Sequence, residues 1–281
     1  MLAWFIVLLL CLGLNTFRAT AKPGLFFKAK QGSIHLMSFN AMMGLKVNEL
    51  SEESRKERIR SKITTVDVLC AQEINEVIEK DLVTLLKLTE HHKIPGKSAK
   101  IYSKYPIISK GQIDFGPGLN SCLWADIVFD QHDTVRIFSA HLESLRLRRS
   151  SYEFLVDVEA KYDKAKKGFQ DLFDKYPDAA AKRADQALQL KKAISKSPYP
   201  VLICGDFNDT PSSFTYRTMK KGLTDTFLTS GKGVASTWRG GIPMLRIDYI
   251  FAGKEFENRS FRTINSDLSD HYPIVASFTL N

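Results

Sequence analysis

Short apolar runs of strand length recur from residue 33 to the end of the chain, and they limit the folds that the chain can adopt. Gly, Asp, Asn or Pro bounds most of them, and several alternate apolar with polar residues, as β-strands do. The runs are 33–40, 67–73, a meander of antiparallel strands over 100–144, 199–209, 246–251 and 272–280. Helical segments lie between them, so the sequence predicts a single α/β domain.

Two of the predicted helices lie in the first third of the chain. A basic segment places Ile59, Ile63 and Val66 on one face. Residues 75–90 continue with helical spacing, and the histidine pair that follows is expected to be the solvated end of that helix.

Residues 147–197 differ from the rest in being rich in Lys, Asp, Glu and Ala. We expect a pair of helices here, divided by Pro177, because proline interrupts the hydrogen bonding of a helix interior. Neither half has enough apolar residues for a core of its own, so the pair is expected to pack on a sheet within the domain.

The first residues, MLAWFIVLLLCLGLN, are apolar almost without interruption. The sequence at 19–21 resembles a signal-peptidase site, but the basic residues follow the apolar run instead of preceding it, which is typical of a membrane anchor. We therefore predict a hydrophobic leader or membrane anchor over residues 1–30 and a catalytic domain over 31–281. The protein is expected to be membrane-associated or exported, with the orientation left open.

Charge and cysteine content narrow the class of partner. The chain has 40 Lys and Arg against 31 Asp and Glu, a net charge of +9, which favours anionic partners such as nucleic acid, phospholipid headgroups or small phosphates. Cys70, Cys122 and Cys204 lie inside strand-like runs and no CxxC motif is present. Buried free thiols are the expected state, which argues against a disulfide scaffold or a thiolate zinc site.

Carboxylate, amide or imidazole side chains stand at the ends of the predicted strands. Strand ends of a packed sheet meet at one edge, where residues distant in sequence can be brought together. The residues concerned are Asn40, Gln72, Glu73, His141, Asp206, Asn208, Asp248, Asp270 and His271. Oxygen donors of this kind suit Mg²⁺ or Mn²⁺ better than zinc. With histidines nearby and a basic surface, they predict attack of water on a phosphate ester.

The motifs SFN, CAQE, SAHL, GDFND, RIDYIF and SDHYPI occur in the order typical of the endonuclease/exonuclease/phosphatase superfamily, which the chain resembles over residues 33–281. The SPYPVLICGDFNDTPSSFTYRTM stretch, and RIDYIF after a TWRGG loop, are similar to a bacterial, membrane-leader subgroup. The resemblance implies a four-layer α/β/β/α sandwich of two mixed, largely antiparallel sheets flanked by helices.

The resemblance also implies roles at a metal site. Glu73 resembles the principal metal ligand, and Asn40 resembles a neighbouring amide that either belongs to the metal shell or positions the phosphate. Asp270 is expected to reach the metal region. The cofactor implied is Mg²⁺ or Mn²⁺.

Five residues resemble the catalytic groups of the family. Asp206 corresponds to the base that activates water, and Asn208 to the amide that holds the phosphate or that water. His271 resembles the imidazole that binds the scissile phosphate, oriented by Asp248. His141 resembles the second histidine of the deoxyribonuclease and sphingomyelinase branches.

Three further residues lie near these motifs. Arg146 and Trp238 are proposed to contact substrate, although a solvated basic face and a core tryptophan are the ordinary alternatives. Asp209 is expected to be a turn residue whose replacement hardly affects the reaction.

Three functions remain open from the sequence. The first is a nuclease-like phosphodiesterase that acts on nucleic acid. The second is a phosphatase or phospholipase C-like hydrolase that acts on phospholipid or inositol phosphates, and the third is a catalytically silent phosphate-binding module. The partners expected are nucleic acid or another phosphoester substrate and, through the N-terminal segment, a membrane; the protein is expected to be a monomer.

Overall fold

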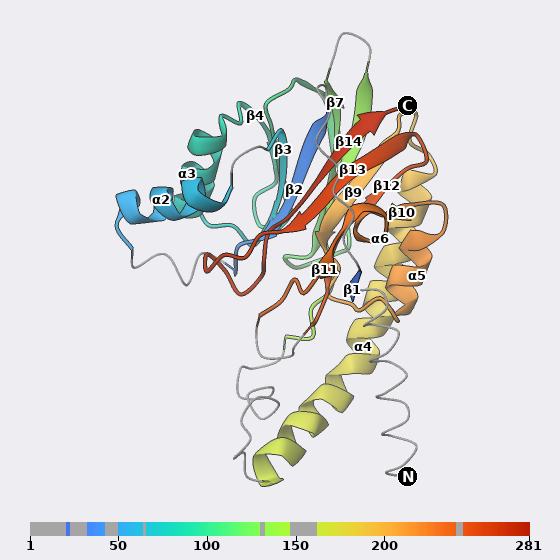
Figure 1. Cartoon of the computed structure of the whole chain (residues 1–281). Helices are drawn as coiled ribbons and strands as arrows, with labels where there is room; N and C mark the ends of the chain where they lie inside the picture. The colour runs from blue at the N-terminus through green and yellow to red at the C-terminus, as the bar shows by residue number, and fades with distance from the viewer. Residues whose placement is uncertain are drawn as a thin grey trace.

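Two six-stranded sheets form the centre of the molecule (Figure 1). The computed structural model describes residues 21–22, 33–42, 50–63, 66–129, 133–146, 162–239 and 244–281. Sheet I has the order β13-β14-β2-β3-β5-β4, and sheet II has the order β10-β12-β9-β8-β7-β6. The strands of sheet I are β2 (Ile34–Asn40), β3 (Val68–Gln72), β4 (Glu90–Lys93), β5 (Lys100–Ser103), β13 (Phe256–Thr263) and β14 (Ile274–Leu280). Those of sheet II are β6 (Ile107–Ile113), β7 (Ser121–Val128), β8 (Thr134–His141), β9 (Val201–Asp206), β10 (Thr224–Asp225) and β12 (Asp248–Ala252). A separate two-stranded ribbon pairs β1 (Ala21–Lys22) with β11 (Gly233–Val234).

The central pair of each sheet is parallel, and the other pairs are antiparallel. In sheet I, β2 and β3 run parallel and end together with Asn40 opposite Gln72. In sheet II, β8 and β9 run parallel and end together with His141 opposite Asp206. The mixed, largely antiparallel sheets that the sequence predicts are therefore confirmed.

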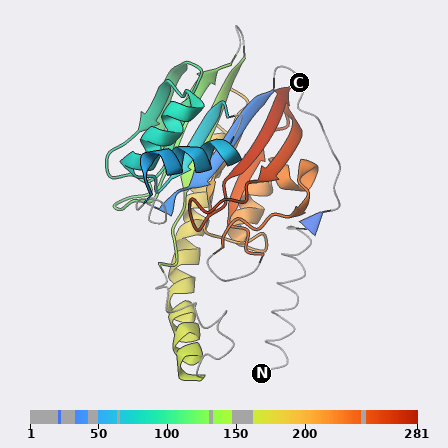
Figure 2. The same ribbon diagram turned by 60° about the vertical axis from the view of Figure 1, so that its left-hand side comes forward.

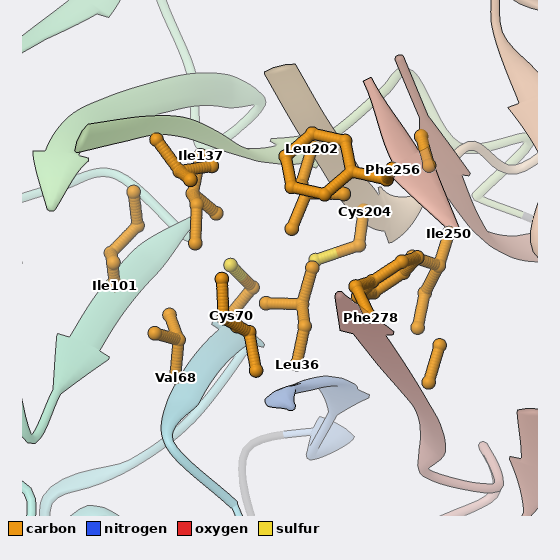
Figure 3. Close-up of a cluster of buried hydrophobic side chains, with 14 of the residues drawn as sticks. Leu36, Val68, Cys70, Ile101, Ile137, Leu202, Cys204, Ile250, Phe256 and Phe278 are labelled. Carbon is orange, nitrogen blue, oxygen red and sulfur yellow. The ribbon is translucent and has the colours of Figure 1, made fainter. Parts of the chain in front are cut away.

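Three separate groups of buried side chains hold four layers together. The first lies between the sheets and includes Leu36, Val68, Leu202 and Ile250 (Figure 3). A second joins sheet I to α2 (Glu52–Lys62) and α3 (Glu76–Leu86) (Figure 2). A third joins sheet II to α4 (Tyr162–Ile194) and α5 (Phe214–Lys220), while the short α6 (Thr226–Ser230) packs beside β12 and β13. This arrangement is the α/β/β/α sandwich.

Local capping signals set where the shorter helices begin. Ser51 accepts a hydrogen bond from the main chain of Ser54 at the start of α2, and Asn75 accepts one from Ile78 at the start of α3. Such side chains satisfy main-chain N–H groups that the first turn of a helix leaves without a partner. Lys87 then adopts a left-handed conformation, φ 55°, which ends α3.

The predicted position of the C-terminal end of the second helix is wrong. We expected helix over 75–90, but α3 stops at Leu86, and Glu90–Lys93 forms the edge strand β4. His92 lies opposite Ile101 of β5 and is buried, with its Nε2 2.9 Å from the carbonyl oxygen of Gly111. Pairing with a strand that lies later in the chain decides the structure here.

The division at Pro177 is also wrong. Residues 162–194 form one continuous helix that contains Pro177, and the part of the predicted pair before residue 162 lies outside the described residues. Proline removes the N–H that would bond to the carbonyl of Phe173, and its ring crowds that carbonyl. The N-terminal part of α4 projects from the sandwich (Figure 1), and Phe173 is 60% exposed, so the helix is solvated where this hydrogen bond is missing. Packing of Ala187 and Leu190 on sheet II holds the C-terminal half.

Cys70, Cys122 and Cys204 are buried free thiols, as predicted. The predicted leader, apart from Ala21 and Lys22, lies outside the described residues, so it remains a prediction, as does the domain boundary at residue 31. In the part of the chain that the structure describes, no helix is long and apolar enough to cross a membrane.

Candidate active site

The ends of the two parallel strand pairs meet at one edge of the sandwich. Asn40 closes β2, and its Nδ2 donates a hydrogen bond of 2.9 Å to Oδ2 of Asp206, which closes β9 in the other sheet. Asp248 begins β12 directly opposite Asp206, because β12 runs antiparallel to β9. His271 lies just before β14, the neighbour of β2. The topology therefore brings together residues as distant in the sequence as Asn40 and His271.

Asp206 is the centre of the group. Its Oδ2 lies 3.9 Å from Nε2 of His141 and 3.9 Å from Nε2 of His271. Its Oδ1 accepts a 2.8 Å hydrogen bond from the main-chain N–H of Asn208, which has a left-handed φ of 51°. Asp206 is buried. One carboxylate thus faces two imidazoles, an arrangement suited to moving protons between a water and a phosphate group.

The two buried acids and His271 influence one another's protonation. Nδ1 of His271 lies 3.0 Å from Oδ2 of Asp248. Burial opposes a charge on His271, but the carboxylates of Asp248 and Asp206 outweigh it and raise the pKa of His271 to about 10. Burial and the charge of Asp248 raise the pKa of Asp206 to about 6, while the two histidines act in the opposite direction. At neutral pH the site therefore holds a cationic His271 beside an ionised Asp206.

His141 is oriented by a hydroxyl group, whereas His271 is oriented by a carboxylate. Its Nδ1 lies 2.6 Å from Oγ of Ser98. Its Nε2 is buried, has no hydrogen-bond partner among the described residues, and lies 3.4 Å from Oε1 of Glu73. A buried polar atom without a partner is costly in a folded protein unless a ligand satisfies it. His141 therefore faces the position of a bound group.

The oxygen donors at this edge fit a divalent cation. Glu73 follows β3 in a left-handed conformation, φ 48°, and its carboxylate is partly exposed, with Oε1 3.4 Å from Nδ2 of Asn40. Oδ1 of Asn40 accepts from the N–H of Met42 at 2.9 Å and retains a second lone pair. Asp206, Asp248 and His271 also lie within 4.8 Å of one another. That trio is already joined through the His271–Asp248 contact, so Glu73 is the better principal ligand for Mg²⁺ or Mn²⁺.

A pocket with a volume of about 480 Å³ opens over these residues. The predicted site residues that line it are Asn40, Glu73, Arg146, Asp206, Asn208, Trp238, Asp270 and His271. His141 and Asp248 do not line it, but both lie next to Asp206, which does. Trp238 is fixed by main-chain pairing with His271, and Tyr176 of α4 contributes a second aromatic ring. The pocket therefore combines an ionic catalytic region with apolar walls.

Sequence reasoning missed a buried ion pair at the edge of the pocket. Nε of Arg183 donates to Oδ2 of Asp209 at 3.1 Å, and its Nη1 donates to the carbonyl of Glu143 at 3.1 Å. Arg183 is fully buried, so the expectation that Asp209 is an ordinary turn residue is wrong. The available signal was the position of Arg183 on α4, four residues from both Ala179 and Ala187, which are themselves buried.

Comparisons with known proteins identify the family and the fold. The family model described as "Endonuclease/Exonuclease/phosphatase family" matches residues 37–271. A crystal structure of the endonuclease/exonuclease/phosphatase from Bacteroides vulgatus has a TM-score of 0.65 at 18% identity, covering 89% of this chain and 99% of that one. Humanised D. rerio TDP2 with 14 mutations gives 0.63 at 18% identity, covering 89% and 100%. The human nocturnin catalytic domain with a bound sulfate anion gives 0.59 at 17%, covering 91% and 97%.

No curated protein matches the sequence significantly. At such low identity the solved structures establish the fold alone, and they confirm the sandwich described above. The family model covers most of the chain and includes every site residue from Asn40 to His271. Members of this family are hydrolases that act on phosphoester bonds, with a divalent metal. The chain belongs to the endonuclease/exonuclease/phosphatase family.

Proposed function

We propose that this protein is a divalent-metal-dependent phosphodiesterase of the nuclease type. The observation that carries the proposal is the position of Asp206 between two imidazoles, one of which is paired with a second carboxylate. A module that only bound phosphate would have no need of an acid with a raised pKa beside a cationic histidine. Such pairs of titratable groups with displaced pKa values are typical of acid–base catalysis.

Asp206 is the base in the proposed reaction. It is ionised at neutral pH and takes a proton from the attacking water, whose position is set by hydrogen bonds from neighbouring amides. The main-chain N–H of Asn208 and Nδ2 of Asn40 hold the two carboxylate oxygens of Asp206. Nδ2 of Asn208 donates to the carbonyl of Leu142, and this hydrogen bond fixes the side-chain amide of Asn208 in the lining of the pocket.

His271 holds the phosphate. As a cation, it donates from Nε2 to a phosphoryl oxygen, while Asp248 keeps Nδ1 protonated and the ring in place. Glu73, with Asn40 and Asp270, would hold Mg²⁺ or Mn²⁺, which supplies charge neutralisation at the phosphoryl oxygens. His141 contributes a second imidazole from the other side of Asp206.

A phospholipase C-like or phosphatase activity is the second candidate. It is favoured by the apolar part of the pocket, where Leu145, Leu245 and Ile247 lie beside Tyr176 and Trp238. Apolar side chains of this kind suit a lipid or an aromatic group attached to the phosphate. Arg146 is exposed at the rim, where it can contact either type of substrate.

The test is hydrolysis by the purified full-length chain with Mg²⁺ or Mn²⁺. The substrates are plasmid DNA, RNA, a bis-aryl phosphate, sphingomyelin and inositol phosphates. Asp206→Asn should abolish hydrolysis, and the exposed Asp114→Asn should not. Cleavage of nucleic acid or the diester supports the proposal, and cleavage of sphingomyelin or inositol phosphates alone supports the second candidate. If the native chain hydrolyses none of these, the proposal is wrong.

A further inference from the structure

The two active-site histidines differ in the group that contacts Nδ1 of the ring. His271 is backed by a carboxylate, Asp248, at 3.0 Å, whereas His141 is backed by a hydroxyl, Ser98, at 2.6 Å. Both rings present Nε2 to the same oxygen of Asp206. The proposed reaction thus uses two imidazoles in unequal environments, and the residue that sets the second environment is Ser98.

Ser98 reaches His141 from the other sheet. It lies in the connection between β4 and β5 of sheet I, while His141 ends β8 of sheet II. Its main-chain N–H donates to the carbonyl of Leu119 at 2.9 Å, and that bond holds the connection independently of the side chain. Ser98 and His141 are both buried, so water cannot replace the hydroxyl.

The single hydroxyl proton of Ser98 decides which atom is the donor in its contact with His141. Oγ of Ser98 carries one proton and lies 2.8 Å from the carbonyl oxygen of Leu119, which can only accept. With that proton directed at Leu119, Nδ1 of His141 must be the donor to Oγ. The ring is then held with Nε2 toward Glu73 and Asp206. A flipped ring would place a carbon against Oγ of Ser98 and lose this bond.

We propose that Ser98 is a positioning residue that holds the His141 ring with Nδ1 protonated and Nε2 facing the reacting phosphate. This inference rests on the proposed function, because it gives His141 a role in phosphoester hydrolysis. Residues that orient a functional imidazole typically change activity by about 10-fold to 100-fold when replaced. Ser98 does not itself touch the pocket.

The kinetic test compares Ser98→Ala, Ser98→Thr and Ser121→Ala on the best substrate with saturating metal. Ser98→Ala should lower kcat by about 10-fold or more, whereas Ser98→Thr, which keeps a hydroxyl, should restore most of it. Ser121 is the matched control: its buried hydroxyl accepts from the N–H of Ala99, next to Ser98, and its main chain pairs with that of His141, so replacing it disturbs the surroundings of the ring without removing the bond to Nδ1. An equal loss in Ser98→Ala and Ser121→Ala would overturn the proposal.

A double-mutant cycle separates positioning from a structural effect. In a His141→Ala background, Ser98→Ala should cause no further loss of kcat, because there is no ring left to orient. The same 10-fold loss in that background would show that Ser98 acts through something other than His141, and the proposal would fail.

A measurement without substrate makes the outcome independent of the proposed function. Side-chain ¹⁵N NMR of the full-length protein, with His141 assigned from its disappearance in His141→Ala, reports which ring nitrogen carries the proton. Native protein should show a protonated Nδ1 on His141, and Ser98→Ala should shift both nitrogen resonances. Unchanged resonances in Ser98→Ala refute the positioning role. If instead no phosphoester is hydrolysed but the resonances shift, the function is wrong and the contact stands.

Discussion

Replacement of Asp206 by Asn is predicted to abolish turnover and to stabilise the protein. The fold holds this carboxylate in a buried place next to Asp248, which raises its pKa from an ordinary 3.8 to about 6. A rise of about 2 in pKa corresponds to about 3 kcal/mol of folding free energy that the ionised group costs at neutral pH. Asn keeps the size and, through its carbonyl oxygen, one of the two hydrogen bonds that the carboxylate accepts, and it carries no charge, so this cost disappears.

The pH dependence has a defined sign. An acid with a higher pKa in the folded state binds its proton more tightly when folded, so its contribution to stability decreases as the pH rises from about 4 through about 6. The Asn variant should therefore melt about 5 °C above the native protein at pH 7.5, with no difference near pH 4. Turnover should fall by about 10²-fold or more, because the base is lost.

The assay is thermal unfolding in excess EDTA at both pH values, together with single-turnover rates in metal. Asp209→Asn is the matched control, three residues away, and should change stability in the opposite direction. It weakens the buried pair with Arg183, which should lower stability by about 3 kcal/mol. An Asp206→Asn protein that melts below native at pH 7.5, or that keeps native turnover, would refute the reasoning.

Three other predictions concern the metal and the leader. Excess EDTA should abolish activity, and full activity in EDTA would contradict a metal-dependent mechanism. Glu73→Gln should raise the metal concentration needed for half activity by about 10-fold, while the exposed Glu76→Gln should not; an unchanged titration would show that Glu73 is misassigned. Deleting residues 1–30 should release the protein from membranes and leave it folded and active, since β2 begins at Ile34. Misfolding of the truncated chain, or a wholly soluble, uncleaved full-length protein, would contradict the leader assignment.

The strands and the residues at their ends were readable from the sequence. A strand alternates its side chains over a few residues and stops at a polar or glycine-rich break, so its position is encoded locally. Asn40, His141 and Asp206 were identified in this way, and the structure places all three at the end of a central strand. The order of the motifs then implied the family and its sandwich.

Tertiary structure decided what local rules could not. Pro177 predicts a break, yet α4 continues because its C-terminal half packs on sheet II. The segment at 90–93 follows a helix, yet it forms a strand because β5 offers it main-chain partners. Hydrogen bonds and buried surface between residues distant in sequence outweigh local propensities, which amount to about 1 kcal/mol for an ordinary residue and about 3 kcal/mol for a proline inside a helix.

Tertiary structure also decides the contacts that support the site residues. Ser98 is an unremarkable loop serine in the sequence, and Arg183 is one of many basic residues in a charged segment. Each acquires its role only when two layers come together: Ser98 of sheet I against His141 of sheet II, and Arg183 of α4 against Asp209 after β9. Chain folding brings these groups within 3.1 Å and excludes water from them, and neither the distance nor the burial is encoded in the local pattern of residues.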